Sequence, residues 1–413
     1  MITPPIYMDN HATTRVDPRV LESMLPYFTE TFGNPASVSH AFGWAAKEAV
    51  DRARASIAAA IGAVAKEIAF TSGATESNNL ALRGAAERLR RKGNHIVSVA
   101  TEHRSVLDPL EKLGQQGFEV TYLPVVQAPS PQAGRVLADQ VAEAIRSDTI
   151  LVSVMLANNE IGVIQPLDQI GRICKERDVL LHTDATQAVG KIPVDVQRLG
   201  VDLMSFSAHK LYGPKGIGAL YVRRRGPMVR LEPLVYGGGH EAGLRSGTLN
   251  VPGVVGFARA LELCLDELST EGPRLASLRD RLLAGLSRGL PGVTLNGPDL
   301  TLPGLRLPGN LNVSFAGVEG ESLLLSASGI ALSSGSACTS ATPEPSHVLR
   351  ALGLGMEATR SSVRFGLGRF NTAEEVESAI GLLVEAVTRL RRLGSHPDSG
   401  PAEPKAATLA PPG

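Results

Sequence analysis

The chain has 413 residues, in which 41 lysines and arginines balance 41 aspartates and glutamates. This length favours two domains over one compact core. A net charge of zero disfavours nucleic acid or an anionic membrane as the main partner, so we expect a small ligand or another protein. The sequence has no apolar run of about 18 residues and does not open on a basic stretch followed by an apolar one, so we expect a cytoplasmic protein.

Short β-rich runs alternate with helical stretches from about residue 67 to residue 223. Several of these runs are almost entirely apolar, as strands are when helices cover both faces of a sheet. The pattern predicts an α/β domain with a mostly parallel sheet. The runs are EIAFTSG, HIVSVA, EVTYLPV, TILVSVMLAN, VLLHTDA, DLMSFSAHK and GALYVR.

A long helical pattern after Gly253, VVGFARALELCLDELS, leads into a further αβ region that ends near Leu393. We therefore expect a large domain over residues 15–262 and a smaller α+β domain formed by residues 1–14 and 263–393. The Pro- and Ala-rich residues 394–413 have little to bury, and we expect them to be disordered.

Polar residues follow the predicted strands, at the sheet edge where ligands of parallel sheets bind. Lys210 lies after one such strand, and Asp184 ends the preceding strand, 26 positions earlier. Enzymes that use pyridoxal phosphate (PLP) need a lysine that forms a Schiff base with the cofactor and a carboxylate that keeps its pyridine nitrogen protonated. The pair predicts a PLP site, although a loop lysine and a helix N-cap would explain each residue alone.

Two further segments are compatible with this site. TSGATESNN predicts a strand-to-helix turn in which the amides of Ala74 and Thr75 meet a phosphate. Ser207 and His209 could add donors there, but an ordinary capped helix start also fits the turn. His103 directly follows its strand, where an imidazole can stack on a cofactor and move protons; a structural role is the alternative.

The three cysteines have different surroundings. Cys174 and Cys264 share helical spacing with apolar neighbours, so we expect both to be buried as small hydrophobic residues. Cys338 lies in ALSSGSACTSATPEP, which has no apolar periodicity, so we expect an exposed and mobile thiol. An incidental surface cysteine is the alternative. Three widely spaced cysteines predict neither a disulfide framework nor a paired metal-ligand set.

Six motifs together resemble the NifS/IscS-type cysteine desulfurases, which are class V aminotransferase-like PLP enzymes. The resemblance runs from about Tyr7 to Leu393 and implies fold type I of the PLP-dependent transferases, with a mostly parallel mixed sheet in the large domain. It implies that sulfur passes from L-cysteine to Cys338 as a persulfide, leaving L-alanine. The motifs are SFSAHKLYGPKG, TDATQ, TSGATESNN, NNEIGVIQP, RSGTLN and SSGSACTS.

The resemblance also implies a role for each matching residue. The catalytic residues are Cys338, Lys210 and His103, of which Lys210 bonds the cofactor and His103 stacks on its ring. Asp184 pairs with the pyridine nitrogen. The remaining cofactor contacts are Asn159 and Gln187 to the ring oxygen, and Ala74, Thr75, Ser207 and His209 to the phosphate.

Two roles extend beyond the cofactor. Thr248 would reach the phosphate of the neighbouring subunit, which requires a homodimer. Arg364 would grip the substrate carboxylate, for which a guanidinium fork is suited, and Asn34 would assist. No firm metal site is implied, although Cys338 could transiently ligate a nascent iron-sulfur cluster.

The long SSGSACTS-type loop is associated in this family with sulfur delivery to an iron-sulfur scaffold protein and to tRNA-thiolation relays. Relatives of the housekeeping type carry a C-terminal segment used in scaffold docking, and this chain has its Pro/Ala-rich tail instead. The sequence therefore leaves the docking route open. It predicts no direct nucleic-acid or membrane partner.

Two rival interpretations remain. Another fold-type-I PLP enzyme, such as a selenocysteine lyase or an aminotransferase, would share Lys210 and Asp184; Cys338 argues against the aminotransferase but leaves the lyase open. A non-catalytic sulfur carrier would be expected to have lost one of these three residues, and all are present. The physiological acceptor and the need for an activating partner are not encoded in any recognisable motif.

Overall fold

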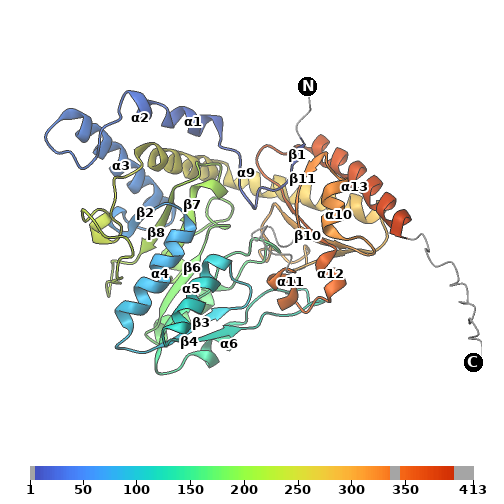
Figure 1. Cartoon of the computed structure of the whole chain (residues 1–413), viewed down its shortest axis with the longest axis horizontal. Helices are drawn as coiled ribbons and strands as arrows, with labels where there is room; N and C mark the ends of the chain where they lie inside the picture. Colours follow the sequence, from blue (N-terminus) through green and yellow to red (C-terminus); the bar gives the residue numbers. More distant parts are fainter. Residues whose placement is uncertain (1–4, 335–344, 395–413) are drawn as a thin grey trace, which may run out of the picture.

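The computed structural model describes residues 5–334 and 345–394. Cys338 and the tail from residue 395 lie outside the described residues. The described chain forms a larger lobe around a seven-stranded sheet and a smaller lobe around a four-stranded sheet (Figure 1). Helix α9 (Val251–Gly289) runs along both lobes.

The large sheet contains all of the predicted strands, in the spatial order β2-β8-β7-β6-β5-β3-β4. Neighbours from β7 to β4 are parallel, whereas β8 is antiparallel to both of its neighbours. The prediction of a mostly parallel mixed sheet is confirmed. The strands are β2 (Ile68–Thr71), β3 (His95–Val99), β4 (Glu119–Leu123), β5 (Thr149–Ser153), β6 (Leu180–Asp184), β7 (Leu203–Ser207) and β8 (Gly218–Val222).

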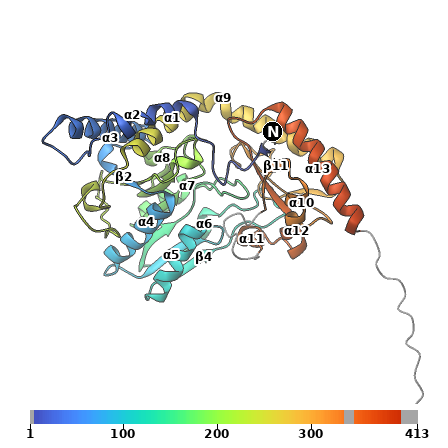
Figure 2. The same cartoon turned by 45° about the horizontal axis from the view of Figure 1, so that its top comes forward.

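Helices cover both faces of this sheet, because successive strand residues point to opposite sides and both sides are apolar. Ile96 packs in the core cluster of α4 and α5, whereas the next residue, Val97, packs in the cluster of α3, α7 and α9. In Figure 2, α3 and α9 lie at the top of the view, with α4 and α5 below. The helices are α3 (Ala41–Ala60), α4 (Ala74–Leu89), α5 (Arg104–Gln115) and α7 (Leu167–Glu176).

The small lobe is an antiparallel sheet in the order β12-β13-β10-β9, backed by α13 and the C-terminal half of α9. The first strand, β1, pairs in parallel with β11, so the N-terminal strand packs with this C-terminal lobe. Helix α9 passes through residues 262–263 without a break, and the domain boundary expected there stays a prediction. The elements are β1 (Ile6–Tyr7), β9 (Val293–Leu295), β10 (Asn310–Phe315), β11 (Ile330–Ala331), β12 (Ser333–Ser334), β13 (Ser362–Gly366) and α13 (Ala373–Gly394).

Shorter helices complete the described chain, and none of the helices described is both long enough and apolar enough to cross a bilayer. They are α1 (Pro18–Met24), α2 (Pro26–Thr29), α6 (Ala138–Ala144), α8 (Val196–Leu199), α10 (Gly320–Ser326), α11 (His347–Ala351) and α12 (Met356–Arg360), with single 3-10 turns at η1 (Ala65–Glu67), η2 (Ala208–Lys210) and η3 (Glu241–Gly243).

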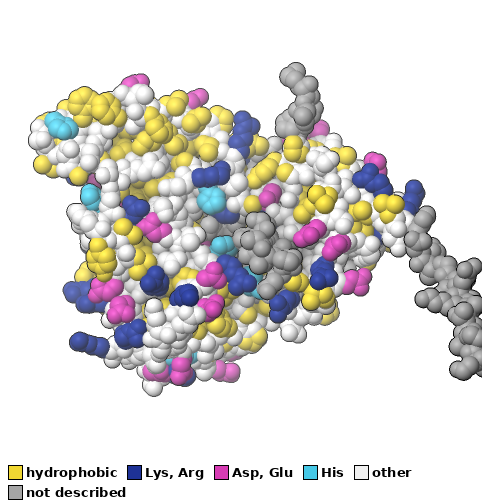
Figure 3. Space-filling view, viewed as in Figure 1, with side chains coloured by type: hydrophobic (Ala, Val, Ile, Leu, Met, Phe, Trp, Pro, Cys, Tyr) yellow, Lys and Arg dark blue, Asp and Glu magenta, His cyan; other side chains and the backbone are white. Residues whose placement is uncertain are grey.

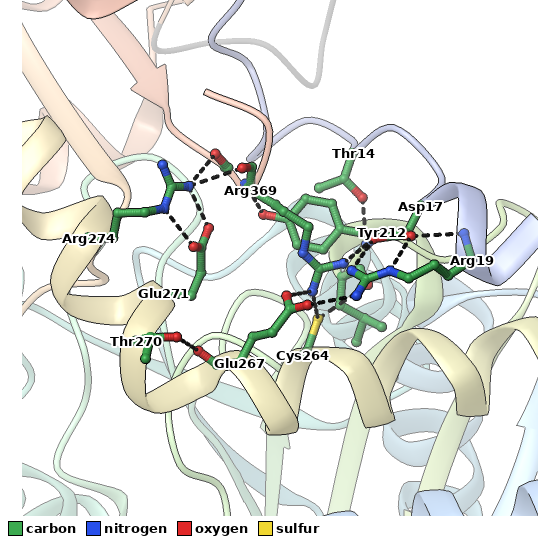
Figure 4. Close-up of polar contacts among 12 residues, drawn as sticks. Thr14, Asp17, Arg19, Tyr212, Cys264, Glu267, Thr270, Glu271, Arg274 and Arg369 are labelled. Atoms are coloured by element: carbon green, nitrogen blue, oxygen red, sulfur yellow. Dashed lines mark hydrogen bonds and ion pairs between the residues drawn. The ribbon is translucent and has the colours of Figure 1, made fainter. Parts of the chain in front are cut away.

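A polar network joins the N-terminal segment, α9 and the loop after β13 (Figure 4). Arg369 forms ion pairs of 2.7 Å with Asp17 and 2.8 Å with Glu267. Arg274 donates hydrogen bonds to the carbonyls of residues 368, 369 and 371. Arginine hydrogen bonds to several partners are geometrically demanding, so this network fixes where the N-terminal segment and the loop after β13 meet α9.

Candidate active site

A cavity of about 580 Å³ lies at the carboxyl edge of the parallel strands. Its wall combines the ends of β6 and β7, the starts of α4 and α5, the segment after β1, and β13 from the small lobe. The structure therefore brings together residues that are distant in the sequence. The predicted site residues that line the cavity are Ala74, Thr75, His103, Asn159, Asp184, Gln187, Ser207, His209, Lys210 and Arg364.

Lys210 and Asp184 enter the cavity from neighbouring strand ends. Lys210 lies on the 3-10 turn that follows β7, and its Nζ donates hydrogen bonds of 2.6 and 2.5 Å to the carbonyls of His11 and Ala12. Asp184 is the last residue of β6 and is 6% exposed. Its Oδ2 accepts a 2.8 Å hydrogen bond from Asn78, which holds the carboxylate in one orientation. Both side chains line the same cavity, and their pairing across one ligand stays a prediction.

The phosphate end of the predicted site lies where α4 begins. This helix has 16 residues and starts at Ala74, so its first amides face the cavity without helical acceptors. Ser207 and His209 line the same end. Burial lowers the pKa of His209 to about 4, and the charges of Lys210 and Lys215 add to this shift. A cavity end with a helix N-terminus and nearby lysines favours an anion.

His103 is the N-cap of α5, and its Nδ1 accepts a 3.1 Å hydrogen bond from the backbone N–H of Ser105. The Ser105 hydroxyl lies 2.8 Å from the same nitrogen and also accepts a 2.8 Å hydrogen bond from Asn78. Because Asn78 also donates to Asp184, a continuous chain of hydrogen bonds joins the carboxylate to the imidazole.

Gln187 and His11 form a second buried cluster at the cavity wall. Gln187 Oε1 lies 3.0 Å from His11 Nδ1 and accepts a 2.7 Å hydrogen bond from Lys191, and its Nε2 donates to the His11 carbonyl. Burial and then Lys191 lower the pKa of His11 well below its ordinary value. The side chain expected to meet the ring oxygen is thus already engaged on both of its polar atoms. Asn159, expected beside it, is 8% exposed and lines the cavity.

Arg364 is 1% exposed on β13 and reaches the cavity from the small lobe. Its guanidinium donates a 2.9 Å hydrogen bond to Asp9 and a 3.1 Å hydrogen bond to the Asn159 carbonyl. Arg364 Nε has no partner among the described residues. A buried guanidinium with donor capacity to spare is suited to a carboxylate ligand.

The cavity carries further unsatisfied polar atoms that fit a polar aromatic cofactor. His11 Nε2 and Thr186 Oγ1 are buried and have no hydrogen-bond partner in the described chain. Buried polar groups are normally paired, so unpaired ones at a cavity wall indicate where a ligand's polar atoms would bind. Together with Lys210, Asp184 and the α4 N-terminus, these residues fit PLP.

Glu160, directly after Asn159, is a buried carboxyl group at the junction of the lobes. Its Oε2 accepts a 2.5 Å hydrogen bond from the hydroxyl of Ser346, the residue before α11. Its backbone carbonyl accepts hydrogen bonds from Asn310 and Asn312 of β10. Burial raises the pKa of Glu160 to about 7, even though Ser346 and Arg364 favour its ionised form.

Two predicted site residues lie away from this cavity. Asn34 is exposed after α2, where its Oδ1 accepts a hydrogen bond from the Ala36 amide, and Thr248 is exposed before α9. Exposed apolar side chains lie in the same stretch of the chain: Phe32 is 62% exposed and Trp44 is 59% exposed. Figure 3 shows hydrophobic side chains gathered over the α1–α3 region.

Of the three cysteines, Cys174 and Cys264 lie within the described residues and Cys338 does not. Cys174 and Cys264 are 1% and 4% exposed, which confirms that both are buried. Burial raises their thiol pKa values to about 12 and about 11, respectively, so neither is a thiolate at neutral pH. Cys338 lies outside the described residues, and its predicted role stays a prediction.

Several site residues did not emerge from the sequence reasoning, namely His11, Asn78, Ser105 and Thr186. Asn78 had a detectable signal, since it is a polar residue on the helix face that also carries Leu82 and Ala85. Ser105 follows His103 at a helix start, where a hydroxyl often caps the turn. His11 had no such signal, because its place depends on β1 pairing with the distant β11.

The family of aminotransferases of class V matches residues 6–378. The chain is 57% identical over 389 residues to the cysteine desulfurase IscS of Anaeromyxobacter sp. (strain Fw109-5), with 94% of each chain covered. A solved NifS-like protein is 40% identical and superposes with a TM-score of 0.85, covering 93% of this chain and all of the other. The structure of SspA in complex with cysteine is 36% identical, with a TM-score of 0.76 over 89% of this chain and all of that one.

These matches extend over both lobes, and they agree with a cavity in which a lysine, a carboxylate and a buried arginine converge. Identity at this level over nearly the whole chain is decisive for the family. The chain belongs to the class-V aminotransferases and, within them, to the NifS/IscS-type cysteine desulfurases.

Proposed function

We propose that this protein takes sulfur from L-cysteine onto its own Cys338, releases L-alanine, and passes the sulfur to an acceptor protein. The observation that carries the proposal is the convergence of Lys210, Asp184 and Arg364 on one cavity. These three side chains offer an amine, a carboxylate and a carboxylate-binding guanidinium, which are the groups that an amino-acid substrate on PLP requires.

The cavity would hold PLP with its phosphate at the start of α4. Ala74, Thr75, Ser207 and His209 would contact the phosphate, and Asp184 would meet the pyridine nitrogen. When bound, the cofactor supplies an electron sink that weakens the bonds at the substrate's α-carbon.

The substrate would be oriented from the small lobe. Arg364 would bind the α-carboxylate through the fork that now contacts Asp9 and the Asn159 carbonyl. Lys210 would accept the proton from the α-carbon at Nζ, for which the amine must be neutral. Its two carbonyl acceptors, at residues 11 and 12, lie on the N-terminal segment that also carries Asp9, so one segment orients both groups.

The Cys338 thiolate would attack the substrate sulfur, forming the new S–S bond as the C–S bond breaks and the electron pair returns to the carbon side. The acceptors we propose are an iron-sulfur scaffold protein and a tRNA-thiolation relay. A cysteine that cycles between thiol and persulfide needs reducing surroundings, so we place the reaction in the cytoplasm.

We also propose that two copies of the chain assemble through the apolar surface formed by residues 21–44. Phe28, Phe32 and Trp44 are 57%, 62% and 59% exposed, and an isolated soluble chain rarely exposes such a cluster. Thr248, exposed before α9, would then reach the phosphate end of the partner's cavity.

The test compares wild type with Cys338→Ala, Lys210→Ala and the buried-cysteine control Cys264→Ala. We expect wild type to bind PLP covalently, with a visible absorption band, and to release alanine from L-cysteine. Cys338→Ala should keep the band and lose turnover, Lys210→Ala should lose the covalent band, and Cys264→Ala should keep both.

Two outcomes would contradict the proposal. If Cys338→Ala turns over L-cysteine as fast as wild type does, the protein is a lyase or a transaminase that uses the same cofactor, and not a desulfurase. Turnover of L-selenocysteine, but not of L-cysteine, by Cys338→Ala and wild type alike would identify a selenocysteine lyase.

A further inference from the structure

We propose that His103 works as a neutral imidazole whose proton is on Nε2, and that Asn78 and Ser105 are the positioning residues that hold it in this form. The proposal rests on the proposed function, because there His103 is the residue that stacks on the cofactor. It makes His103 a hydrogen-bond donor to the reacting groups and assigns proton removal from the substrate to Lys210.

The backbone decides which ring nitrogen carries the proton. The amide of Ser105 can only donate, and it donates to His103 Nδ1 at 3.1 Å. A proton on Nδ1 would point at this N–H, so Nδ1 must offer its lone pair. In a neutral imidazole, the proton then lies on Nε2.

The Ser105 hydroxyl acts in the same direction, because it accepts from Asn78 and keeps its own hydrogen for the Nδ1 lone pair that the backbone amide selects. Asp184 only accepts, so the Asn78 atom 2.8 Å from its Oδ2 is the amide nitrogen and not the oxygen. The second hydrogen of that nitrogen is donated to Ser105 Oγ, also at 2.8 Å. With the lone pair on Nδ1, the Ser105 hydroxyl donates its hydrogen to this nitrogen, 2.8 Å away. Asn78 is fully buried, and Ser105 is 8% exposed, so water does not compete strongly for either group.

The position of His103 in the fold also disfavours a positive ring. His103 is the N-cap of α5, a helix of 12 residues, and the partial positive charge of a helix N-terminus opposes an imidazolium. Titratable groups that interact with it include Glu160 and His347. An ionised Glu160 would favour the imidazolium, but burial raises the pKa of Glu160 to about 7 and so weakens this effect at neutral pH.

A neutral ring protonated on Nε2 can donate on the cofactor side but cannot accept a proton there. The α-proton of the substrate therefore goes to Lys210 Nζ, which becomes an ammonium, while His103 keeps its own proton. Asn78 donates hydrogen bonds both to Asp184 and to Ser105, which contacts His103. The same residue therefore orients the carboxylate expected at the pyridine nitrogen and the imidazole expected to stack on the cofactor.

The direct test is nitrogen-15 NMR of the PLP-loaded protein labelled at histidine, with His103→Gln used to identify the His103 signals. We expect, at pH 7.5, a correlation pattern with the proton on Nε2 and a lone pair on Nδ1. A proton on Nδ1, or on both nitrogens, at this pH overturns the proposal. The result does not depend on turnover, so a protein that fails to desulfurate cysteine would refute the proposed function and leave this assignment standing.

Ser105→Ala removes one donor to Nδ1 and should make the ring easier to protonate. A neutral hydrogen bond of this kind predicts that the pH midpoint of the His103 signal rises by about 0.5 to 1 unit. The matched control is Ser98→Ala, which removes a buried hydroxyl in β3 that has no partner among the described residues and should not move the midpoint. An unchanged midpoint in Ser105→Ala contradicts the positioning role.

A side chain that can donate but not titrate should partly replace His103. His103→Gln is expected to keep at least ~10-fold more turnover than His103→Ala, because an amide N–H supplies the donor without a base. Equal turnover of the two variants, with the covalent PLP band intact in both, would contradict the donor role.

Discussion

The carboxyl edge of the large sheet and the surface formed by residues 21–44 are built in opposite ways. At the sheet edge, polar side chains are buried or partly buried and form hydrogen-bond networks, as from Asp184 through Asn78 and Ser105 to His103. Over residues 21–44, the apolar side chains are exposed, with Phe32 at 62%. One chain thus forms the hydrogen-bonded network of the sheet edge, whereas the exposed surface indicates contacts that a second chain would supply.

Of the changes at the sheet edge, Lys210→Ala is expected to have the largest effect on turnover. We expect turnover to fall by at least ~10³-fold, because the variant loses both the covalent attachment and the proton acceptor. Alanine release from L-cysteine measures the loss. Lys175→Ala, which removes an exposed lysine from α7, should retain wild-type turnover. A smaller loss would mean that another lysine of the cavity can replace Lys210.

A milder change at the same edge is Arg364→Lys, which keeps the positive charge but removes the two-pronged guanidinium group. The loss of paired hydrogen bonds to the substrate carboxylate should raise KM by roughly 10- to 100-fold with a small effect on kcat. Steady-state kinetics with L-cysteine separate the two parameters. The control is Arg360→Lys on α12, where the side chain is exposed. A fall in kcat with KM unchanged would contradict carboxylate binding.

The double variant Phe32→Asp with Trp44→Asp tests the subunit contact proposed for the exposed surface. Charges in an apolar contact should separate the subunits and lower turnover by ~10-fold or more, because Thr248 would no longer reach the partner's cavity. Sedimentation velocity measures the mass, and cofactor affinity measures the phosphate contact. Leu325→Asp, on α10 of the small lobe with 83% exposure, is the matched control and should remain a dimer. If the double variant still sediments as a dimer, the subunit contact lies elsewhere on the molecule.

The contrast also explains what could be predicted from the sequence. The strands of the large sheet and the polar residues at their ends were predictable, because a strand buried on both faces is a run of apolar residues and its ligand groups follow it directly. Cys174 and Cys264 were predictable from helical spacing alone.

Residues placed by long-range contacts were not predictable in the same way. His11 reaches the cavity because Gly366 on β13 lets the N-terminal segment approach closely: a Cβ there would lie 2.7 Å from the His11 amide. The ion pair between Arg364 and Asp9 joins residues 355 positions apart. Thr248 belongs to the RSGTLN motif, but its predicted contact is the phosphate of a neighbouring subunit, which lies outside a single chain. Asn34 lies away from the cavity whose substrate it was predicted to help bind.

The junction of the lobes offers a pH-dependent prediction through Glu160, whose pKa burial raises from 4.5 to about 7. As pH rises from about 4.5 to 7, the unfolded chain loses this proton before the folded chain does, so folding loses stability over this window. The relevant quantity is the free energy of unfolding of wild type minus that of Glu160→Gln. This difference should be higher at pH 5 than at pH 8, by about 3 kcal/mol at most. Urea unfolding at the two pH values measures it, and the comparison with Glu160→Gln cancels the other titrating groups. Glu176→Gln, at an exposed position of α7, should give no such difference.

The smallest effect is expected at the buried cysteines, and it tests whether sulfur chemistry is confined to Cys338. Burial raises the pKa of the Cys174 thiol to about 12, so this side chain presents no thiolate for sulfur transfer at neutral pH. Cys174→Ala should leave turnover unchanged and cost about 1 kcal/mol of stability through the lost packing. Alkylation of the native protein with iodoacetamide, followed by mass spectrometry, should modify Cys338 before Cys174 or Cys264, and prior incubation with L-cysteine should add the mass of one further sulfur to the alkylated Cys338 peptide alone. Rapid labelling of a buried cysteine would mean that the helices around it open far more readily than their packing implies.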